Sequence, residues 1–300
     1  MLRILREEKG ATIVLLALSI SALLGFAALA IDVGNMYLNK ARLSNLADAA
    51  ALAGAQDLPD EPQLAEDSAK SYAAQNGLAS DVVGVSVSNN NTVIAVTAAR
   101  TVPFFFAKIF DKTSANVAAR AVAAIRTITA ASGVVPFGIV QQQFIYGDTY
   151  NLKAGAGAGY HGNYQALALG GTGATVYQNN IEKGYSGQLH VGEMISTETG
   201  VMSGATSKGI DYRMDLDKYA TFAALKMSSP RILIVPIIDS LDINGRGEVK
   251  ILGFAAFFLE GVGKSGNENY VTGKFVQMIS PGEIGTGVAD YGLYGSTLIE

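Results

Sequence analysis

The sequence lacks cysteine altogether and contains only two histidines, His161 and His190. Without thiols the chain can form no disulfide framework, no cysteine nucleophile and no thiolate metal site. The histidines lie far apart in the sequence, so a metal site would need carboxylates such as Glu193 or Asp148 to complete it. We interpret both histidines as ordinary loop or strand residues, and we predict no metal and no other cofactor.

Positive charge is scarce as well, because 22 lysines and arginines stand against 26 acidic residues, a net charge of −4. A chain of this balance has no overall electrostatic attraction for nucleic acid or for an anionic surface. We therefore predict no nucleic-acid partner.

Catalytic and ligand-binding motifs are incomplete. The segment Gly200–Gly204 lacks a glycine at the place that a G-x-S-x-G serine nucleophile needs. Gly155–Gly159 lacks the spacing of the third glycine, the following helix and the Lys-Ser/Thr pair of nucleotide loops. Asp239–Gly245 offers oxygen ligands, but strands flank it where a calcium loop needs helices, and Leu241 stands where a D-x-S-x-S metal-adhesion motif needs serine. The sequence therefore indicates a structural or interaction protein and no enzyme.

A long apolar run is present at the N-terminus. Ala11–Ile31 contains no charged residue and follows Arg3, Arg6 and Lys9. As a helix this run reaches about 30 Å, the thickness of the hydrocarbon core of a bilayer. We predict a single transmembrane anchor, which makes the lipid bilayer the first partner of the chain.

Two alternatives to a permanent anchor are open. Ala28-Leu29-Ala30 fits the small-x-small rule of a cleaved signal peptide, although the run exceeds the usual apolar length of such a peptide. The second alternative is a buried core helix, but such a helix is normally shorter or carries a polar face. Three positive residues precede the run, and two, Lys40 and Arg42, follow it. This difference in positive charge favours a cytoplasmic N-terminus and an extracytoplasmic remainder.

The helix is predicted to continue beyond the membrane as an amphipathic stalk over Asp32–Gln56, until Pro59 and Pro62 end it. Small residues such as Ala50 and Ala53 allow close helix packing, so we predict a surface for partner helices; packing on the protein's own sheet is the alternative. The apolar stripe of this stalk comprises Val33, Met36, Tyr37, Leu43, Leu46, Ala50 and Ala53.

A small α+β unit is predicted after the stalk. Its expected elements are a helix over Asp60–Gly77, a hairpin of Val82–Val87 and Thr92–Ala98 around Asn89–Asn91, a short helix over Phe104–Phe110 docked on the sheet, and a closing strand over Asn116–Thr127 with Val117, Ala119, Ala121 and Ala123 on one face. We interpret the aromatic cluster Phe104–Phe106 as core.

From Val134 short apolar runs alternate with glycine, which predicts a mostly β region. Asn244-Gly245 marks a hairpin turn, and the aromatic run Gly253–Phe258 is interpreted as core. The predicted fold class is α+β: a single transmembrane helix that continues into a stalk, a small pilin-like domain and a mostly β, glycine-rich C-terminal domain. The predicted boundaries are 1–31, 32–130 and 131–300.

The N-terminal pattern resembles the TadE/TadG-like group of Flp (tight adherence) pilus assembly proteins. The resemblance rests on Glu8-Lys9-Gly10 before the apolar run, Ala30–Gly34 with Tyr37 at its end, and the alanine-rich run Ala47–Ala55. Val102–Lys108 also looks like the family. Two C-terminal segments, Gly162–Tyr164 and Gly253–Leu259, resemble the glycine-rich region of some TadG-like proteins.

This resemblance implies a non-catalytic, single-pass component of the bacterial cell envelope, within a type IV-like pilus assembly or secretion apparatus, in a minor-pilin-like or anchoring role. It implies other Tad/Flp assembly proteins or pilins as partners of the N-terminal helix. Leu15 stands where class III prepilins carry glutamate at the fifth mature position, which argues against processing at Gly10 and against a major pilin.

Two further interpretations are open to test. Asp32 and Asp48 recur in the family pattern, yet as residues they are interpreted as a helix-face carboxylate at the membrane interface and a solvated helix position. The alternative function is an anchored surface or periplasmic binding module unrelated to pili, whose β domain captures a ligand.

Overall fold

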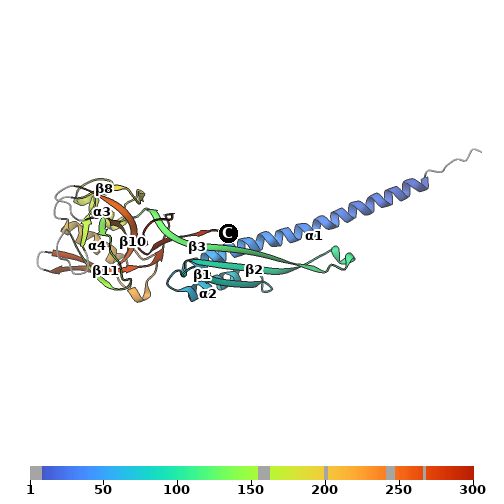
Figure 1. The fold of residues 1–300 in the computed structure, drawn as a ribbon, viewed down its shortest axis with the longest axis horizontal. Coiled ribbons are helices and arrows are strands. Elements are labelled where there is room, and N and C mark those ends of the chain that lie inside the picture. Colours follow the sequence, from blue (N-terminus) through green and yellow to red (C-terminus); the bar gives the residue numbers. More distant parts are fainter. Residues whose placement is uncertain (1–8, 155–162, 199–201, 241–246, 266–267) are drawn as a thin grey trace, which may run out of the picture.

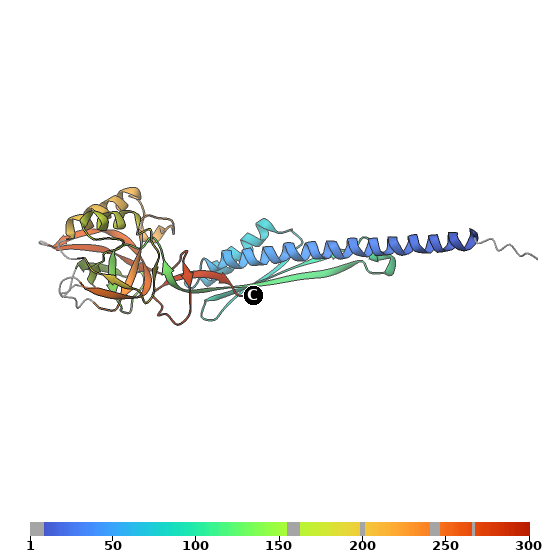
Figure 2. The ribbon, with the colours of Figure 1, turned by 90° about the horizontal axis from the view of Figure 1, so that it is seen from above.

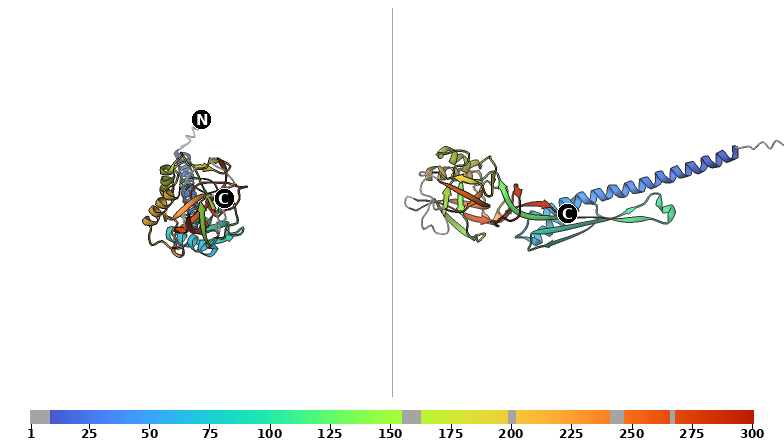
Figure 3. Two further views of the ribbon diagram at one scale, coloured as in Figure 1. Left: turned by 90° about the vertical axis from the view of Figure 1, so that its left-hand side faces the viewer. Right: turned by 45° about the horizontal axis from the view of Figure 1, so that its top comes forward.

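The computed structural model describes residues 9–154, 163–198, 202–240, 247–265 and 268–300. The molecule is elongated, and helix α1 (Lys9–Ala55) projects from one end (Figure 1). A first sheet lies along the C-terminal half of this helix, and a second, curled sheet with two helices lies at the opposite end. The view from above and the oblique view show the same linear order (Figure 2 and the right side of Figure 3).

Helix α1 is continuous over 47 residues, which confirms the prediction that the apolar run extends into a stalk. Alanine and leucine dominate its sequence, and both favour helix. The helix ends at Ala55, ahead of Pro59, because proline cannot donate the backbone hydrogen bond that would continue it.

The first sheet has the strand order β1-β2-β3-β14-β12 and packs against α1 and α2. Its first two strands form the predicted antiparallel hairpin, and Asn89, Asn90 and Asn91 in its turn have φ of 51°, 51° and 63°. Asparagine tolerates this left-handed conformation better than most residues do. The elements are α2 (Pro62–Asn76), β1 (Val82–Ser88), β2 (Val93–Pro103), β3 (Ser114–Ala131), β14 (Leu293–Leu298) and β12 (Met278–Ile279).

The core beneath the first sheet is made largely of alanine. Ala47, Ala50 and Ala51 of α1 are fully buried, and the small side chains let the helix lie close to the strands. The predicted inward face of the closing strand is confirmed, since Val117, Ala119, Ala121 and Ala123 are all buried.

A matched pair of glycines in α1 tests how tight this packing is. A Cβ atom on Gly54 would lie 2.6 Å from the carbonyl oxygen of Ala65 and 2.5 Å from Cδ1 of Ile94, whereas a Cβ on Gly34 would meet nothing within 4 Å. We expect Gly54→Ala to destabilise the first unit by about 1–3 kcal/mol through overpacking. Gly34→Ala should stabilise the helix by up to about 1 kcal/mol.

Hydrogen exchange of the detergent-solubilised full chain measures both variants. Equal effects at the two positions would contradict the close contact of α1 with α2.

The second sheet has the strand order β11-β5-β6-β4-β9-β10-β8, and β10 also pairs with β11, so six strands close into a ring. Strands β9 and β10 are antiparallel neighbours as predicted, although Asn244-Gly245 between them lies outside the described residues. The strands are β4 (Phe137–Val140), β5 (Thr149–Ala154), β6 (Asn163–Ala166), β8 (Met194–Ser196), β9 (Ile232–Ile238), β10 (Glu248–Ser265) and β11 (Glu268–Val276).

Strand β10 is buried on both faces. One core contains Ala255, Phe257 and Leu259. The core on the opposite face contains Phe254, Ala256 and Phe258. A strand covered on both sides reads as a continuous apolar run instead of alternating with polar residues. The interpretation of Gly253–Phe258 as core is therefore confirmed.

Two helices in this region were not predicted, so the expectation of a mostly β unit is corrected to a mixed one. Helix α3 (Ala174–Lys183) and helix α4 (Ser203–Leu216) lie together on one side of the curled sheet (Figure 2). Gly209 permits their contact, because a Cβ there would lie 2.7 Å from the Ile181 side chain. Gly204 and Gly209 weaken the helical signal of α4 in the sequence.

Buried arginines tie these helices to the strands. Arg213 on α4 donates to the carbonyl oxygens of Ile181 and of Pro230, the latter at 2.7 Å, and burial lowers its pKa to about 10. Arg231 donates to the carbonyls of Leu259 and Ala220 at 2.8 and 2.7 Å. Each guanidinium thus hydrogen-bonds backbone carbonyls of two separate segments and joins them.

The C-terminal segment returns to the first sheet. Strand β14 pairs antiparallel with β3, from Tyr294 opposite Thr127 to Leu298 opposite Ala123. The far end of β3 also pairs with the short strands β7 (Leu189–His190) and β13 (Glu283–Ile284). Strand β3 therefore connects the two units, and its distal residues share a core with β10.

Candidate membrane-anchoring and assembly surface

The N-terminal half of α1 is exposed along its whole circumference. From Thr12 to Ile31 every side chain is exposed except Ala28, which is half-buried. By length and composition the helix is able to cross a membrane, a test that a signal sequence near an N-terminus also meets. The large exposed side chains are Ile13, Val14, Leu15, Leu16, Leu18, Ile20, Leu23, Leu24, Phe26, Leu29 and Ile31.

The predicted apolar stripe of the stalk divides into two parts. Val33 and Tyr37 are 55% and 76% exposed, whereas Leu43, Leu46 and Ala50 are buried against the first sheet. The prediction that Ala50 belongs to a surface for partner helices is therefore wrong, and the alternative of packing on the protein's own sheet is confirmed. The second alanine of that prediction, at position 53, is half-buried.

Asp32, which the sequence places on the helix face at the predicted membrane exit, is buried and only 3% exposed. The backbone N–H groups of Phe105, Phe106 and Ala107 donate to its two oxygens at 2.7, 3.1 and 2.7 Å. The carboxylate thus satisfies three donors at the start of a short helical turn. Asp48, the other recurring aspartate, is half-buried on α1.

The turn held by Asp32 is η1 (Ala107–Phe110), a single turn of 3₁₀ helix between β2 and β3. It lies at the tip of the long β2–β3 hairpin beside α1, so the predicted short helix exists but is not docked on the sheet (Figure 1). The interpretation of Phe104–Phe106 as core is wrong: Phe105 and Phe106 are exposed and Phe104 is half-buried.

An apolar groove separates this turn from α1. Its volume is about 660 Å³. The helix lines one side from Ser21 to Asp32, and the turn lines the other with Phe106, Ala107, Ile109 and Phe110.

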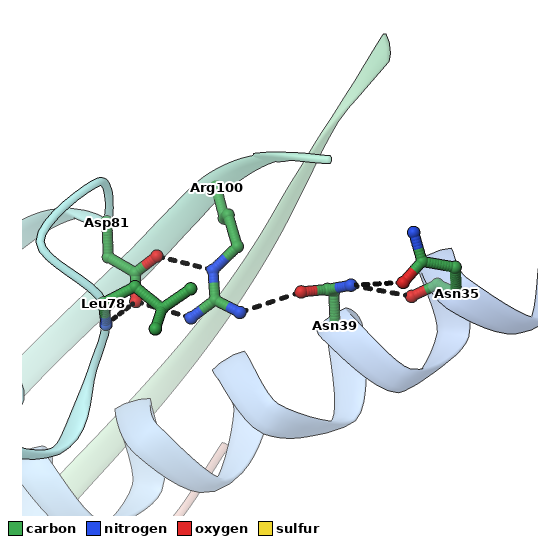
Figure 4. A network of polar contacts seen from close by, with 5 residues as sticks. All are labelled: Asn35, Asn39, Leu78, Asp81 and Arg100. Carbon is green, nitrogen blue, oxygen red and sulfur yellow. Dashed lines mark hydrogen bonds and ion pairs between the residues drawn. The ribbon is translucent and has the colours of Figure 1, made fainter. Parts of the chain in front are cut away.

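A partly buried polar network joins α1 to the sheet, at helix residues that follow those lining the groove (Figure 4). Arg100 on β2 donates to both oxygens of Asp81 at 2.6 and 2.7 Å, and to Oδ1 of Asn39 on α1 at 2.8 Å. Asn39 in turn donates to Asn35, and the N–H of Leu78 donates to Asp81 at 2.9 Å. Hydrogen bonding to Arg100 holds the pKa of Asp81 below its usual range against the opposing effect of burial. The network fixes the loop after α2, strand β2 and the stalk relative to one another.

The candidate catalytic and metal-binding residues do not form a site within the described part of the chain. His190 is exposed, and its Nδ1 lies 3.8 Å from Oε2 of Glu193. No group of three metal-ligating side chains occurs among the described residues. Asp239 accepts the N–H of Lys250 at 3.0 Å at the end of β9. Outside the described residues lie His161, Gly155–Gly159, Gly200, Val201 and Leu241, whereas Ser203 and Gly204 form the start of helix α4.

Sequence reasoning missed the roles of Asp32 and Arg100. The signal for Asp32 was present, since a lone carboxylate directly after a long apolar run needs a partner. The sequence around Arg100 contains no comparable signal, because its partners Asp81 and Asn39 are 19 and 61 residues away.

Comparison with known proteins identifies the N-terminal segment. No curated protein and no solved structure gave a significant match to the chain. Residues 10–57 match the family model described as Flp pilus-assembly TadE/G-like. This segment coincides with α1 and the turn that follows it, and includes the exposed apolar half, Asp32 and the stalk. The chain therefore carries a TadE/G-like Flp pilus-assembly domain at its N-terminus.

Proposed function

We propose that this protein is a non-catalytic, membrane-anchored component of a Flp pilus assembly or secretion apparatus, in a minor-pilin-like or anchoring role. The observation that carries the proposal is the coincidence of the family segment with a helix whose first half is exposed and apolar and whose second half packs on a sheet. In this arrangement one helix serves both as the anchor and as the spine of the folded unit.

The proposal assigns residues 1–31 to a short cytoplasmic N-terminus and the membrane span, 32–130 to a pilin-like unit, and 131–300 to an extracytoplasmic region of mixed α+β structure. The C-terminal strands β12 and β14 of this last region belong to the sheet of the pilin-like unit. The three positive residues before the span favour this orientation. The stalk, fixed by Asp32 and Arg100, holds the folded units outside the membrane, where they are available for adhesion or for contact with other pilus components.

Fractionation tests the anchor. We expect the full-length protein in the membrane pellet after an alkaline carbonate wash, because about 20 exposed apolar residues cannot remain in water. A soluble protein whose mature N-terminus is Ile31 would show instead that the run is a cleaved signal peptide.

Pilus formation tests the role. Deleting the gene should abolish or reduce Flp pili, and the full chain should restore them. A chain in which residues 12–31 are replaced by a cleavable signal peptide should be exported but should not restore pili. Normal piliation without the protein would contradict the proposal and favour an anchored binding module.

A further inference from the structure

We propose that the aromatic tip, residues 105–112, is a second membrane-contact element that enters the outer interface of the bilayer beside α1. The inference rests on the proposed membrane span of α1 and adds an interaction surface to it. The ligand is phospholipid: acyl chains in the apolar groove and headgroups around the rim of the tip.

The first line of support is the exposure of the aromatic tip. Phe105 and Phe106 are 60% and 41% exposed, and Ile109 and Phe110 are 80% and 78% exposed. Single exposed apolar residues are common on soluble proteins, but four large ones within six positions form a contiguous patch that marks an interaction site.

The position of the tip is the second line of support. Three backbone hydrogen bonds to Asp32 fix the tip at the residue where the apolar span ends. The groove then runs back along α1 from Asp32 to Ser21, eleven residues or about 16 Å of helix. The aromatic side chains therefore lie beside the last apolar turns of α1, so a bilayer that surrounds those turns also surrounds the tip.

The chemistry of the tip matches the membrane interface. Amphipathic elements in the membrane interface bury phenylalanine and other large apolar side chains at the boundary between headgroups and acyl chains, and their lysines extend their charged ends toward the headgroups. Lys108 and Lys112 are exposed on the tip, next to the exposed Asp111. Asp32, which also lies beside the tip, accepts hydrogen bonds from backbone donors. Two lysines against one free aspartate favour a lipid surface, and anionic lipid in particular.

A second point of contact would fix the rotation of α1 about its own axis. Ala28 faces the groove, and Tyr37, nine residues later, lies on the opposite side of the helix at about 100° per residue. If the tip is held in lipid, the exposed Val33 and Tyr37 face away from it, toward any partner that approaches along the membrane.

Single-tryptophan variants test the proposal, because the chain contains no tryptophan of its own. We choose Phe110→Trp in the tip, Leu18→Trp in the middle of the span, and Tyr219→Trp after α4, where the native tyrosine is 94% exposed. Each full-length variant is reconstituted into vesicles of phosphatidylcholine and phosphatidylglycerol, with lipids brominated either near the headgroup or near the end of the acyl chain.

We expect the tryptophan at position 110 to emit at shorter wavelength than the one at position 219, and to be quenched most by bromine near the headgroup. Emission at position 110 that matches position 219 would overturn the proposal. So would a blue shift without quenching, which would mean that the tip packs on protein, including a second copy. The tryptophan at position 18 reports separately on the span: if deep bromine fails to quench it, the anchor itself is refuted, while position 110 still decides whether the tip touches lipid.

Discussion

Replacing Asp81 with alanine is expected to raise hydrogen-exchange rates across β1, β2 and the loop after α2 by about two orders of magnitude, which corresponds to about 3 kcal/mol. Both members of the Arg100–Asp81 pair are buried, with side chains 8% and 3% exposed. Removing the carboxylate leaves a guanidinium with two unsatisfied donors in a site with little water. We use the low end of the range for a broken buried pair because Arg100 also borders a small solvent cleft with Arg42 and Tyr72.

The stabilisation that Asp81 provides is expected to decrease at acidic pH. The pKa of Asp81 is lower in the folded protein than in the unfolded chain, mainly because Arg100 hydrogen-bonds the carboxylate. The pair therefore stabilises the fold at all pH values above the unfolded pKa of about 3.9, and this stabilisation is lost as the pH falls through the lower folded value. The difference between wild type and Asp81→Ala should be constant near neutral pH and should shrink below about pH 4.

Lys70→Ala is the matched control for this prediction. The Lys70–Glu66 pair on α2 spans one helical turn, and its side chains are 46% and 28% exposed, so its loss should cost less than about 0.5 kcal/mol. Hydrogen exchange followed by mass spectrometry separates the first sheet from the second within one molecule. Equal effects of the two substitutions would show that the Arg100 network does not hold the stalk to the sheet.

The sequence predicted the elements whose signal is local. Helix α1, the β1–β2 hairpin with its three asparagines and the inward face of β3 all follow from periodicity and turn residues within a few positions. The same holds for the run that became β10, because a strand buried on both faces is apolar throughout. The family pattern added a function that no periodicity could supply.

Several failures have the same physical cause, which is contact between residues far apart in the chain. The pairing of β14 with β3 joins segments about 170 residues apart, and nothing in either strand specifies the other. The three backbone donors to Asp32 lie 73 to 75 residues away. Phe105 and Phe106 were assigned to the core because aromatic residues are usually buried, but both are exposed at the tip of the β2–β3 hairpin.

Tyr37→Ala is expected to abolish or strongly reduce piliation while the protein remains at its normal level. Tyr37 is 76% exposed on the stalk, just beyond the predicted membrane exit, so its loss removes almost no internal contact and should change stability by less than about 0.5 kcal/mol. An exposed tyrosine beside the exposed Val33 is the type of residue that contributes most to protein interfaces, often 2 kcal/mol or more. We therefore place the assembly surface here and no longer at the alanines of the stripe.

Two further variants make the result decisive. Ala50→Leu inserts three carbon atoms into a fully buried site, so it should destabilise the first unit by about 1–3 kcal/mol and lower protein and pili together. Tyr219→Ala removes a tyrosine of similar exposure at the opposite end of the molecule and should leave both unchanged. Abundance by immunoblot and pili by electron microscopy are measured on the same cells. Normal pili in Tyr37→Ala at normal abundance would exclude this face of the stalk from assembly, because no loss of folding would be available to explain the difference.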